Sequence, residues 1–504
     1  MRIVLWHGWL LEGSGSNIAT ARVAEVLRAA GHDILLVCQE RHPERYPWID
    51  AVGTVGPDGV AIQAAETGGA GAGRCVLLQP DIGELLPVFV IDEYEGFATV
   101  KTFLDLTEDE LDTYLAHNVD ALRTAAEWHG SEAAIAGHAI PGAAVARRAL
   151  GDGAYVAKIH GSDVEYALRP QQRYRDLAGE GLRAARAVIG PSTDVLDRLS
   201  ALVPGLEGLG RIVRPGVDTA RFHPLPRHDA LLGAAARLDR DAADLAGGRP
   251  DGLDAEVARA LAARDADALD ALAHRYDQAM PDATAASTLR AVAERDRPLI
   301  GYFGKLIPQK GVELLLQAAR ATETDPDVLV VGFGLHREWL TALAAALAGD
   351  GLGWLEGTGR LALDPEPAPG RPERDGIVAF TGRLDHRFAP GAIAAMDVLV
   401  VPSILEEAFG MVSAEGAAAG ALPLVARHSG LAEVASALEH EVGVPGLFSF
   451  EPGPGASARL AEGVDRLLVL PSEERRALTE TVSAFVAREW SWERTVEGLL
   501  EALG

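Results

Sequence analysis

Two glutamates that flank a Phe-Gly bend are the residues of this chain best suited to chemistry. Glu407 and Glu415 stand eight positions apart, with Phe409-Gly410 between them. A Pro-Ser pair before Glu407, together with Gly410, predicts that Glu407 lies in a loop and Glu415 inside the helix that follows. We expect a cavity between the two carboxylates, facing an anion through free backbone N–H groups at the helix start. Those N–H groups belong to Gly410, Met411 and Val412.

Two lysines follow a predicted strand in the run Gly304-Lys305-Leu306-Ile307-Pro308-Gln309-Lys310-Gly311, ahead of a helix predicted to begin near Val312. Doubly wound sheets bind ligands at the carboxyl edge of their strands, so both lysines are predicted to lie at such an edge. Fixed cations at such an edge can stabilise negative charge that develops on a bound group during a reaction. Lys305 and Lys310 are therefore candidates to stabilise it, with Gly304 beside them.

His160 follows the predicted strand Tyr155 to Ile159 and precedes Gly161, which permits close approach by a ligand. We expect its side chain at the carboxyl edge of the first sheet. Asp163, three residues later, is predicted to cap the next helix rather than to act as a catalytic base.

A weaker signal is the run Gly13-Ser14-Gly15-Ser16-Asn17, between the first predicted strand and a helix predicted to begin near Ile18. Such a loop suits a phosphate group. It also suits a dinucleotide, although its two glycines form an incomplete G-x-G-x-x-G pattern. Both interpretations stay open on these residues.

Short apolar runs alternate with Ala-rich helical segments, which predicts parallel sheets covered by helices. We expect two doubly wound sheets, with the first series of strands before residue 190 and the second after residue 298. The intervening residues 225–296 show helical periodicity without strands and are predicted to be a helical insertion. The expected domains are 1–224, joined by a C-terminal helix at 485–504, then the insertion 225–296, and 297–484.

Composition limits the possible partners. The 504 residues are 48% hydrophobic and 24% charged, typical of a soluble globular protein with more than one core. A net charge of −27 argues against nucleic acid, which binds clustered Lys and Arg. Cys38 and Cys75 are predicted to be buried strand cysteines, as in a reducing cytoplasm. No transmembrane segment is predicted, and peripheral contact with a membrane stays open.

The run around the two glutamates resembles the E-x7-E signature of the family-four retaining glycosyltransferases. The lysine run resembles that family's Gly-Arg-Leu…Lys-Gly motif, with Lys305 in place of the usual Arg, so that positive charge is kept and a planar fork is lost. His160-Gly161 resembles the family's His-Gly, whose histidine lies near the donor sugar. Phe380-Thr381-Gly382-Arg383-Leu384 resembles the stretch that borders the nucleotide base.

The resemblance implies a GT-B fold, with two facing Rossmann-like domains and a cleft between them. It implies catalytic roles for His160, Lys305, Lys310 and Glu407, and donor binding by Gly15, Ser16, Gly304, Arg383, Leu384, Phe409, Gly410, Met411, Val412 and Glu415. In this scheme Glu415 accepts hydrogen bonds from ribose hydroxyls, and Glu407 contacts a hydroxyl of the donor sugar.

The implied reaction moves a sugar from a nucleotide-diphosphate sugar, with UDP favoured, to a hydroxyl-bearing acceptor, with retention and same-face attack. No resident cofactor or metal is expected, because no Asp-x-Asp motif stands at a strand end and the lysines can offset the diphosphate charge. Two alternatives stay open: a dinucleotide-dependent oxidoreductase, and a nucleotide-sugar-binding protein without catalytic activity. The residues do not indicate the acceptor, although the stretch 92–101 and His138 are expected to line its side of the cleft.

Overall fold

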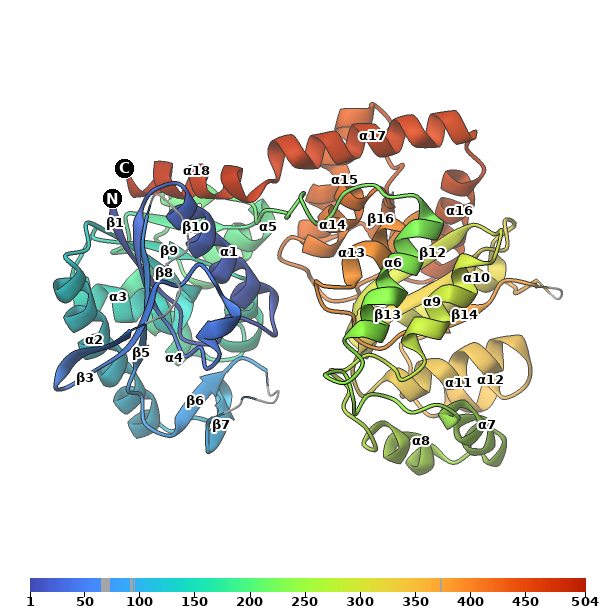
Figure 1. Cartoon of the computed structure of the whole chain (residues 1–504), viewed down its shortest axis with the longest axis horizontal. Coiled ribbons are helices and arrows are strands. Elements are labelled where there is room, and N and C mark those ends of the chain that lie inside the picture. Colours follow the sequence, from blue (N-terminus) through green and yellow to red (C-terminus); the bar gives the residue numbers. More distant parts are fainter. Residues whose placement is uncertain (65–72, 91–93, 95, 372–373) are drawn as a thin grey trace. The chain divides into compact units, whose positions relative to one another are not determined.

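The computed structural model describes residues 1–64, 73–90, 94, 96–371 and 374–504. The chain folds into two compact units, each with its own sheet (Figure 1). Unit 1 comprises Met1–Gly216 and Trp492–Gly504, and unit 2 comprises Val217–Ser491. The sequence suggests boundaries at 224/225, 296/297 and 484/485, whereas the contacts divide the chain at 216/217 and 491/492.

The main sheet of unit 1 has nine strands within the described residues, in the order β11-β10-β9-β8-β1-β2-β5-β3-β4. The strands are β1 (Arg2–Trp6), β2 (Asp33–Val37), β3 (Ala51–Gly56), β4 (Gly59–Ala64), β5 (Cys75–Pro80), β8 (Ala133–Gly137), β9 (Val156–Lys158), β10 (Ala187–Gly190) and β11 (Gly210–Ile212). A separate parallel pair is formed by β6 (Leu85–Val88) and β7 (Thr99–Thr102). The central strands β1, β2 and β8 are almost wholly buried, which is why they read as unbroken apolar runs in the sequence.

The helices of unit 1 are α1 (Gly15–Ala29), α2 (Glu108–His129), α3 (Ala143–Leu150), α4 (Gln172–Leu182), α5 (Thr193–Leu202) and α18 (Trp492–Leu503). Figure 1 shows α2 and α3 on one side of the main sheet and α1 on the other. The sheet is therefore covered on both faces, as a doubly wound parallel sheet requires.

The β3–β4 hairpin is the antiparallel exception, and the sequence analysis missed it. Its strands pair from Ala51 with Ala64 to Gly56 with Gly59, around a turn in which Gly59 has a φ of 100°. The Asp58-Gly59 pair is the turn signal that could have revealed it. Strand β6 ends at Val88, and part of the expected acceptor stretch, residues 92, 93 and 95, lies outside the described residues.

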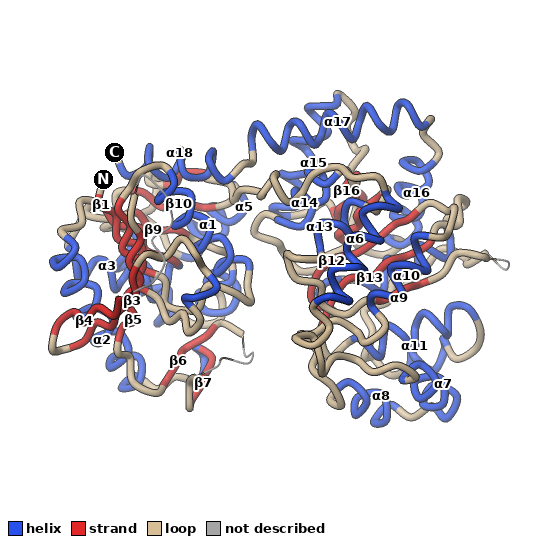
Figure 2. Tube along the Cα trace, in the orientation of Figure 1, coloured by secondary structure: helices blue, strands red, loops and turns tan. Residues whose placement is uncertain are grey.

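Unit 2 contains a sheet of six parallel strands within the described residues, in the order β14-β13-β12-β15-β16-β17. Figure 2 shows β12, β13 and β16 of this sheet, with helices around them. The strands are β12 (Leu299–Lys305), β13 (Asp327–Phe333), β14 (Val378–Phe380), β15 (Val398–Val401), β16 (Leu422–Ala426) and β17 (Ser449–Phe450). The helices are α6 (Arg227–Arg240), α7 (Leu253–Ala263), α8 (Ala266–Ala273), α9 (Ala285–Ala293), α10 (Val312–Ala321), α11 (Arg337–Ala348), α12 (Leu352–Gly357), α13 (Ala389–Ala394), α14 (Met411–Ala419), α15 (Ser429–Val442), α16 (Ala456–Leu468) and α17 (Ser472–Glu489).

The helical segment 225–296 is part of unit 2 by its packing. Helix α6 packs against α9 and α13, and α7 and α8 both pack against α11. Its buried leucines, such as Leu231 and Leu269, share one apolar core with the residues of β12 and β13. The segment therefore extends the core of unit 2 instead of forming a separate body.

The chain leaves unit 2 at Ser491 and enters unit 1 at Trp492. The Trp490 indole packs edge to face on Phe409 and Phe485 within unit 2. Helix α18 then packs against α1 of unit 1, where Thr495 donates a hydrogen bond to the Arg214 carbonyl at 2.8 Å. Among the described residues, the helices are all too short or too polar to cross a membrane.

Leu231→Ala tests whether α6 belongs to the core of unit 2. Leu231 is fully buried, so we expect a loss of about 2–5 kcal/mol in the free energy of unfolding, measured by urea denaturation. Hydrogen exchange should speed up in β12 and remain unchanged in β1. Leu225→Ala, at a leucine that is 37% exposed, is the control with little expected effect. A loss of stability in Leu231→Ala no larger than that in Leu225→Ala would contradict this assignment.

Candidate active site

The sheet of unit 2 changes its winding direction between β12 and β15. From β12 the chain continues to β13 on one side, and from β15 it continues to β16 on the other, although β12 and β15 are parallel neighbours. The two crossovers leave in opposite directions, so the loops at the carboxyl ends of these strands border a crevice where doubly wound folds bind ligands. Both motifs singled out in the sequence follow these two strands.

The loops after β12 and β15 are in direct contact. The Gln309 carbonyl accepts hydrogen bonds from the N–H groups of Ile404 and Leu405 at 2.8 and 3.1 Å. Gly311 has a φ of 66°, and a Cβ there would lie 2.2 Å from the Pro402 carbonyl oxygen. Only glycine permits both this backbone conformation and this approach. Runs separated by about a hundred positions in the chain thus form one surface.

Lys310 and Glu407 form the central ion pair of this surface. The Lys310 ammonium donates to Oε1 of Glu407, and the Ser403 hydroxyl donates to the same oxygen at 2.8 Å. The side chains of Lys310 and Glu407 are 26% and 21% exposed, so both remain accessible to a ligand. The sequence predicted both as site residues and missed Ser403.

The backbone around Glu407 is held by the start of α15. The Glu407 N–H donates to the Ser429 hydroxyl at 2.9 Å, and its carbonyl accepts from the Gly430 N–H at 3.0 Å. His428 donates from Nε2 to the Ser403 carbonyl at 2.7 Å. These contacts lie more than twenty positions downstream of Glu407, and the sequence offered no signal for them.

Helix α14 begins immediately after this loop, as the sequence predicts. Gly410 occupies the N-cap in the left-handed region, with a φ of 84° and no side-chain capping bond. For the N–H groups of Met411 and Val412, no acceptor is found within the described residues. Unsatisfied N–H groups and the helix dipole together favour an anion at this end. The Phe409 ring is buried against Trp490, so only its backbone can face a ligand.

Glu415 lies inside α14, whereas Glu407 lies in the loop, as expected from the sequence. Glu415 is only 6% exposed, and its Oε1 lies 3.7 Å from Nε2 of His386. His386 in turn packs edge to face on Phe222. The two glutamates therefore have different partners, a lysine and a histidine, and the sequence analysis did not single out the histidine.

Lys305 and Arg383 flank the ring of Phe333, at the end of β13. The Lys305 Nζ lies 5.7 Å and the Arg383 guanidinium carbon 5.3 Å from the ring centroid, within the range of cation–π attraction. The Tyr302 hydroxyl donates to the Lys305 carbonyl at 2.8 Å and holds the end of β12. Leu384 is 1% exposed and belongs to the apolar core, so a contact with ligand through its side chain is excluded.

In unit 1 the corresponding change of winding direction lies between β1 and β8. Three histidines follow the carboxyl ends of strands there: His7 after β1, His138 after β8 and His160 beyond β9. The rings of His138 and His160 are in contact at a tilt of 34°, with centroids 4.4 Å apart, and those of His7 and His138 are 5.8 Å apart. The sequence predicted His160 here and expected His138 near the acceptor, but it missed His7.

Burial keeps these histidines neutral. It lowers the pKa of His7 to about 4, although a hydrogen bond with Asn17 opposes the shift. Burial is the main reason, and the neighbouring basic groups a further one, why the pKa values of His138 and His160 lie well below the ordinary value for histidine. Lys158 is the nearby cation, and burial lowers its pKa to about 8. Within the described residues no carboxylate forms an ion pair with Lys158.

Asp163 organises the backbone beside these rings. Its Oδ2 accepts from the Ala139 N–H at 2.7 Å, and its Oδ1 accepts from the N–H groups of Gly161 and Val164 at 2.9 and 3.1 Å. The expected capping role is thereby observed, and the same carboxylate also ties the loop after β8 to the loop after β9. Burial raises its pKa, which the three backbone bonds oppose.

The Gly-rich run near the N-terminus is more helical than the sequence predicts. Helix α1 begins at Gly15 instead of near Ile18, with Ser14 as its N-cap accepting from the Asn17 N–H at 3.3 Å. Gly15 and Ser16 therefore lie in the first turn of a helix, where N–H groups point outward. The prediction that they contact a donor phosphate stays untested.

Lysine usage offers a signal that the sequence analysis overlooked. Four of the 46 basic residues are lysines, and three of these, Lys158, Lys305 and Lys310, stand at the carboxyl ends of strands beside the two winding changes. Arginine stays charged at any accessible pH, whereas a buried lysine can lose its proton. The small number of lysines would have pointed to Lys158 as a candidate site residue.

Comparison with known proteins shows which family model and which relative the chain resembles. Residues 297–470 match the family model described as glycosyl transferases group 1. A glycogen synthase from Thioalkalivibrio sulfidiphilus is 26% identical over 206 residues, which cover 40% of this chain and 37% of that protein. Unit 2 carries a glycosyl transferases group 1 domain. The resemblance to glycosyltransferases found in the sequence is thereby confirmed.

Solved structures match the whole chain in fold at low sequence identity. Sucrose-phosphate synthase from Thermosynechococcus elongatus gives a TM-score of 0.61 at 18% identity, covering 99% of this chain and 97% of that one. HepE from Anabaena, in complex with UDP and glucose, gives 0.57 at 14% identity and covers 100% and 99%. Starch synthase IV from Arabidopsis thaliana, bound to ADP and acarbose, gives 0.55 at 13% identity with the same coverage. The whole chain therefore has the GT-B fold.

The neutral histidines predict that unit 1 loses stability in acid. Unfolded histidines bind protons below about pH 6.5, whereas His7 in the fold binds one only near pH 4. The unfolded state binds more protons in this window, so the free energy of unfolding falls as pH falls from about 6.5 to about 4, by up to about 1.4 kcal/mol per pH unit for each such histidine.

His138→Asn should make that dependence shallower, as measured by urea unfolding at a series of pH values. Asparagine tolerates the left-handed backbone of this position, where φ is 71°. His274→Asn, at an exposed histidine of unit 2, is the matched control. An identical slope in wild type and in His138→Asn would contradict the assignment.

Proposed function

We propose that this protein is a retaining glycosyltransferase that moves a sugar from a nucleotide-diphosphate sugar to a hydroxyl-bearing acceptor without a resident metal. The observation that carries the proposal is the winding change of unit 2, where the Lys310–Glu407 pair stands next to the start of α14. The site offers cations and free N–H groups for a diphosphate, and carboxylates for sugar and ribose hydroxyls.

The diphosphate would bind Lys305, Lys310 and the N–H groups of Met411 and Val412. Its oxygens compete with Glu407 for the Lys310 ammonium, because both are anions that favour the same cation. Glu407, with one oxygen held by Ser403, then turns its other oxygen to a hydroxyl of the donor sugar. Glu415, buried and beside His386, accepts from the ribose hydroxyls.

The reaction exchanges one bond for another on a single face of the sugar. The bond between the anomeric carbon and the diphosphate oxygen breaks as the acceptor oxygen forms its bond to that carbon. The acceptor proton passes to the departing diphosphate oxygen, so no carboxylate nucleophile is needed. The fixed cations and helix N-terminus stabilise the charge that grows on the diphosphate.

UDP is the favoured nucleotide, with ADP as the second to test. HepE was solved with UDP and starch synthase IV with ADP, and both share the fold of this chain. Here Arg383 and the Phe333 ring form a flat, cationic surface at the end of β13 on which a base can stack. Lys305 presents a point charge where an arginine would present a planar, bidentate group. We therefore expect the site to be less selective for the geometry of the phosphates.

On unit 1, His160 contributes a neutral imidazole whose buried Nε2 has no hydrogen-bond partner within the described residues. We assign this nitrogen to a hydroxyl of the donor sugar. The His138 ring packs against it and holds it in place, and Asp163 fixes the backbone on both sides.

Lys310→Ala and Glu415→Ala test the donor site. Lys310→Ala removes a fixed cation aimed at the developing charge, so kcat/KM should fall by about 100- to 1,000-fold. The rate is measured by release of nucleoside diphosphate from UDP-glucose or ADP-glucose, with a cell extract as the acceptor source. Arg488→Ala removes an equal charge from the exposed surface of α17 and is the control expected to keep wild-type rates. Wild-type turnover in both site variants would refute the proposal, as would a thermal shift with nicotinamide dinucleotides but none with nucleotide sugars.

Stereochemistry and metal dependence form a separate test. We expect the anomeric proton of the product, followed by nuclear magnetic resonance during the reaction, to show the configuration of the donor sugar. The rate should be unchanged by a chelator, because lysines and N–H groups take the place of a cation at the diphosphate. An inverted product, or activity that chelation removes and added magnesium restores, would overturn these two parts of the proposal.

A further inference from the structure

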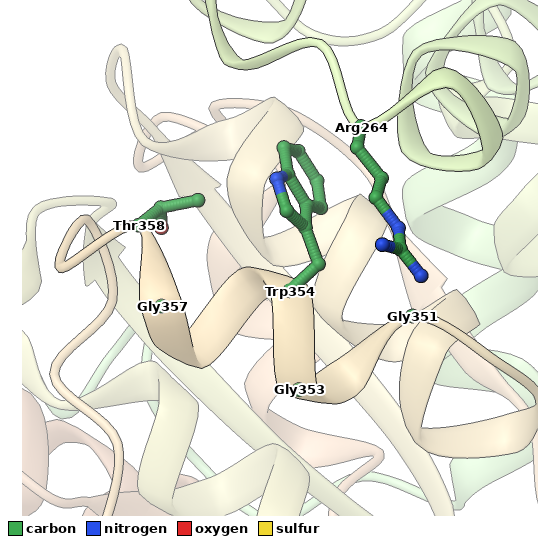
Figure 3. A pocket seen from close by; sticks show the side chains of 6 residues that line it. All are labelled: Arg264, Gly351, Gly353, Trp354, Gly357 and Thr358. Atoms are coloured by element: carbon green, nitrogen blue, oxygen red, sulfur yellow. The ribbon is translucent and has the colours of Figure 1, made fainter.

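A surface hollow in unit 2 is lined by none of the residues proposed for the donor site. It has a volume of about 550 Å³ and is lined by Arg264, Gly351, Gly353, Trp354, Gly357 and Thr358 (Figure 3). Five of these belong to α12 and its flanks, and Arg264 follows α7 in the helical segment 225–296. The proposed sugar transfer assigns no role to the segment 225–296.

Trp354 is held as a platform by a second tryptophan. Its indole stacks on Trp339, with ring centroids 6.4 Å apart and an angle of 26° between the planes. Trp339 is 2% exposed and donates from its indole N–H to Asp270 at 2.8 Å, and Arg360 donates to the other oxygen of that carboxylate at 2.9 Å. The platform is therefore rigid without any ligand, although Trp354 itself is only partly buried.

Arg264 stands beside this platform in an unusual backbone conformation. It caps the end of α7 with a φ of 57°, where glycine is the common residue, and an arginine there costs about 1 kcal/mol or more. The part of the chain that the structure describes contains no ion-pair or hydrogen-bond partner for its guanidinium group. Figure 3 shows this side chain next to the indole of Trp354, with the guanidinium group toward Gly351.

Glycines keep the surroundings of the indole open. No atom lies within 4 Å of a Cβ built at Gly353 or Gly357, and neither has a positive φ, so both could carry a side chain without strain. Gly357 is three positions after Trp354 and shares its helix face. Gly351 differs, because its φ of 108° and the nearby Leu261 of α7 require glycine. The hollow is thus an accessible strip beside a flat aromatic ring.

We propose that this hollow is a second saccharide-binding site, distinct from the donor site, for a neutral oligosaccharide chain. The apolar C–H face of a pyranose packs on the Trp354 ring, as apolar groups do on aromatic faces. The five N–H donors of Arg264 bind its hydroxyls. A neutral chain fits better than an acidic one, because Asp350 and Glu356 are exposed beside the hollow and the protein carries a net charge of −27.

The helical segment 225–296 thereby acquires a function. Its α7 delivers Arg264 to a tryptophan of α12, and its α8 delivers the Asp270 that fixes the tryptophan below. The site would hold a glycan at a distance from the reaction. The binding does not depend on sugar transfer, so it should persist in Lys310→Ala.

The test measures binding of maltoheptaose, cellohexaose and xylohexaose to the full-length protein by isothermal titration calorimetry without donor. We expect at least one to bind, and Trp354→Ala to weaken that binding by about tenfold. Gly357→Leu should weaken it similarly by filling the strip, while keeping or raising thermal stability because leucine favours a helix more than glycine does. Trp128→Ala, at a tryptophan of α2 that is 47% exposed, is the matched control.

The proposal is overturned if none of the three binds at millimolar concentration, or if binding is unaffected by Trp354→Ala and Gly357→Leu. It is also overturned if an oligogalacturonate binds as tightly as the neutral chains, or if UDP alone binds in a way that Trp354→Ala abolishes, since the hollow would then take an acid or a nucleotide. Loss of saccharide binding in Trp354→Ala with unchanged turnover on a small acceptor separates this site from the donor site.

Discussion

The ion pair between Lys310 and Glu407 is the contact on which the candidate donor site depends. It joins the loops after β12 and β15, two neighbouring strands whose crossovers leave the sheet in opposite directions. Parallel sheets create such a crevice wherever the winding changes, because no helix covers that point. Gly311 lets the loops approach, and Ser403 and the start of α15 hold the carboxylate in position. Without the pair, a lone carboxylate would stand where the proposal places a diphosphate.

This geometry also explains why a site for a dianion can exist on a strongly acidic chain. With a net charge of −27, long-range attraction works against an anionic donor, so the binding energy has to come from short-range contacts. Lys305, Lys310 and the first N–H groups of α14 provide such contacts within one surface of unit 2. In the free protein Glu407 occupies Lys310, so the cation is already oriented when a donor arrives.

Unit 1 uses the opposite strategy at its own winding change. His7, His138 and His160 are neutral through burial, and Lys158 is a cation that accompanies them. Neutral imidazoles can donate to and accept from hydroxyl groups, which suits sugar recognition better than a fixed charge does. The two units therefore differ in chemistry although both are doubly wound: one offers cations for phosphate, and the other offers polar, uncharged groups. The Trp354 platform differs from both of these sites, because its main feature is a flat apolar ring.

Sequence alone determined the local part of this protein. Alternating apolar runs indicated the central strands of both sheets, and the bends at Gly311 and Gly410 placed Lys310 before a helix and Glu415 within one, because strand burial and glycine turns act over a few residues. Tertiary structure alone decided which distant residues meet: Ser403 and Ser429 around Glu407, His386 beside Glu415, His7 and His160 around His138, and Arg264 beside Trp354. Strand order sets those meetings, and it follows from how whole helices pack on a sheet, which no short run of residues encodes.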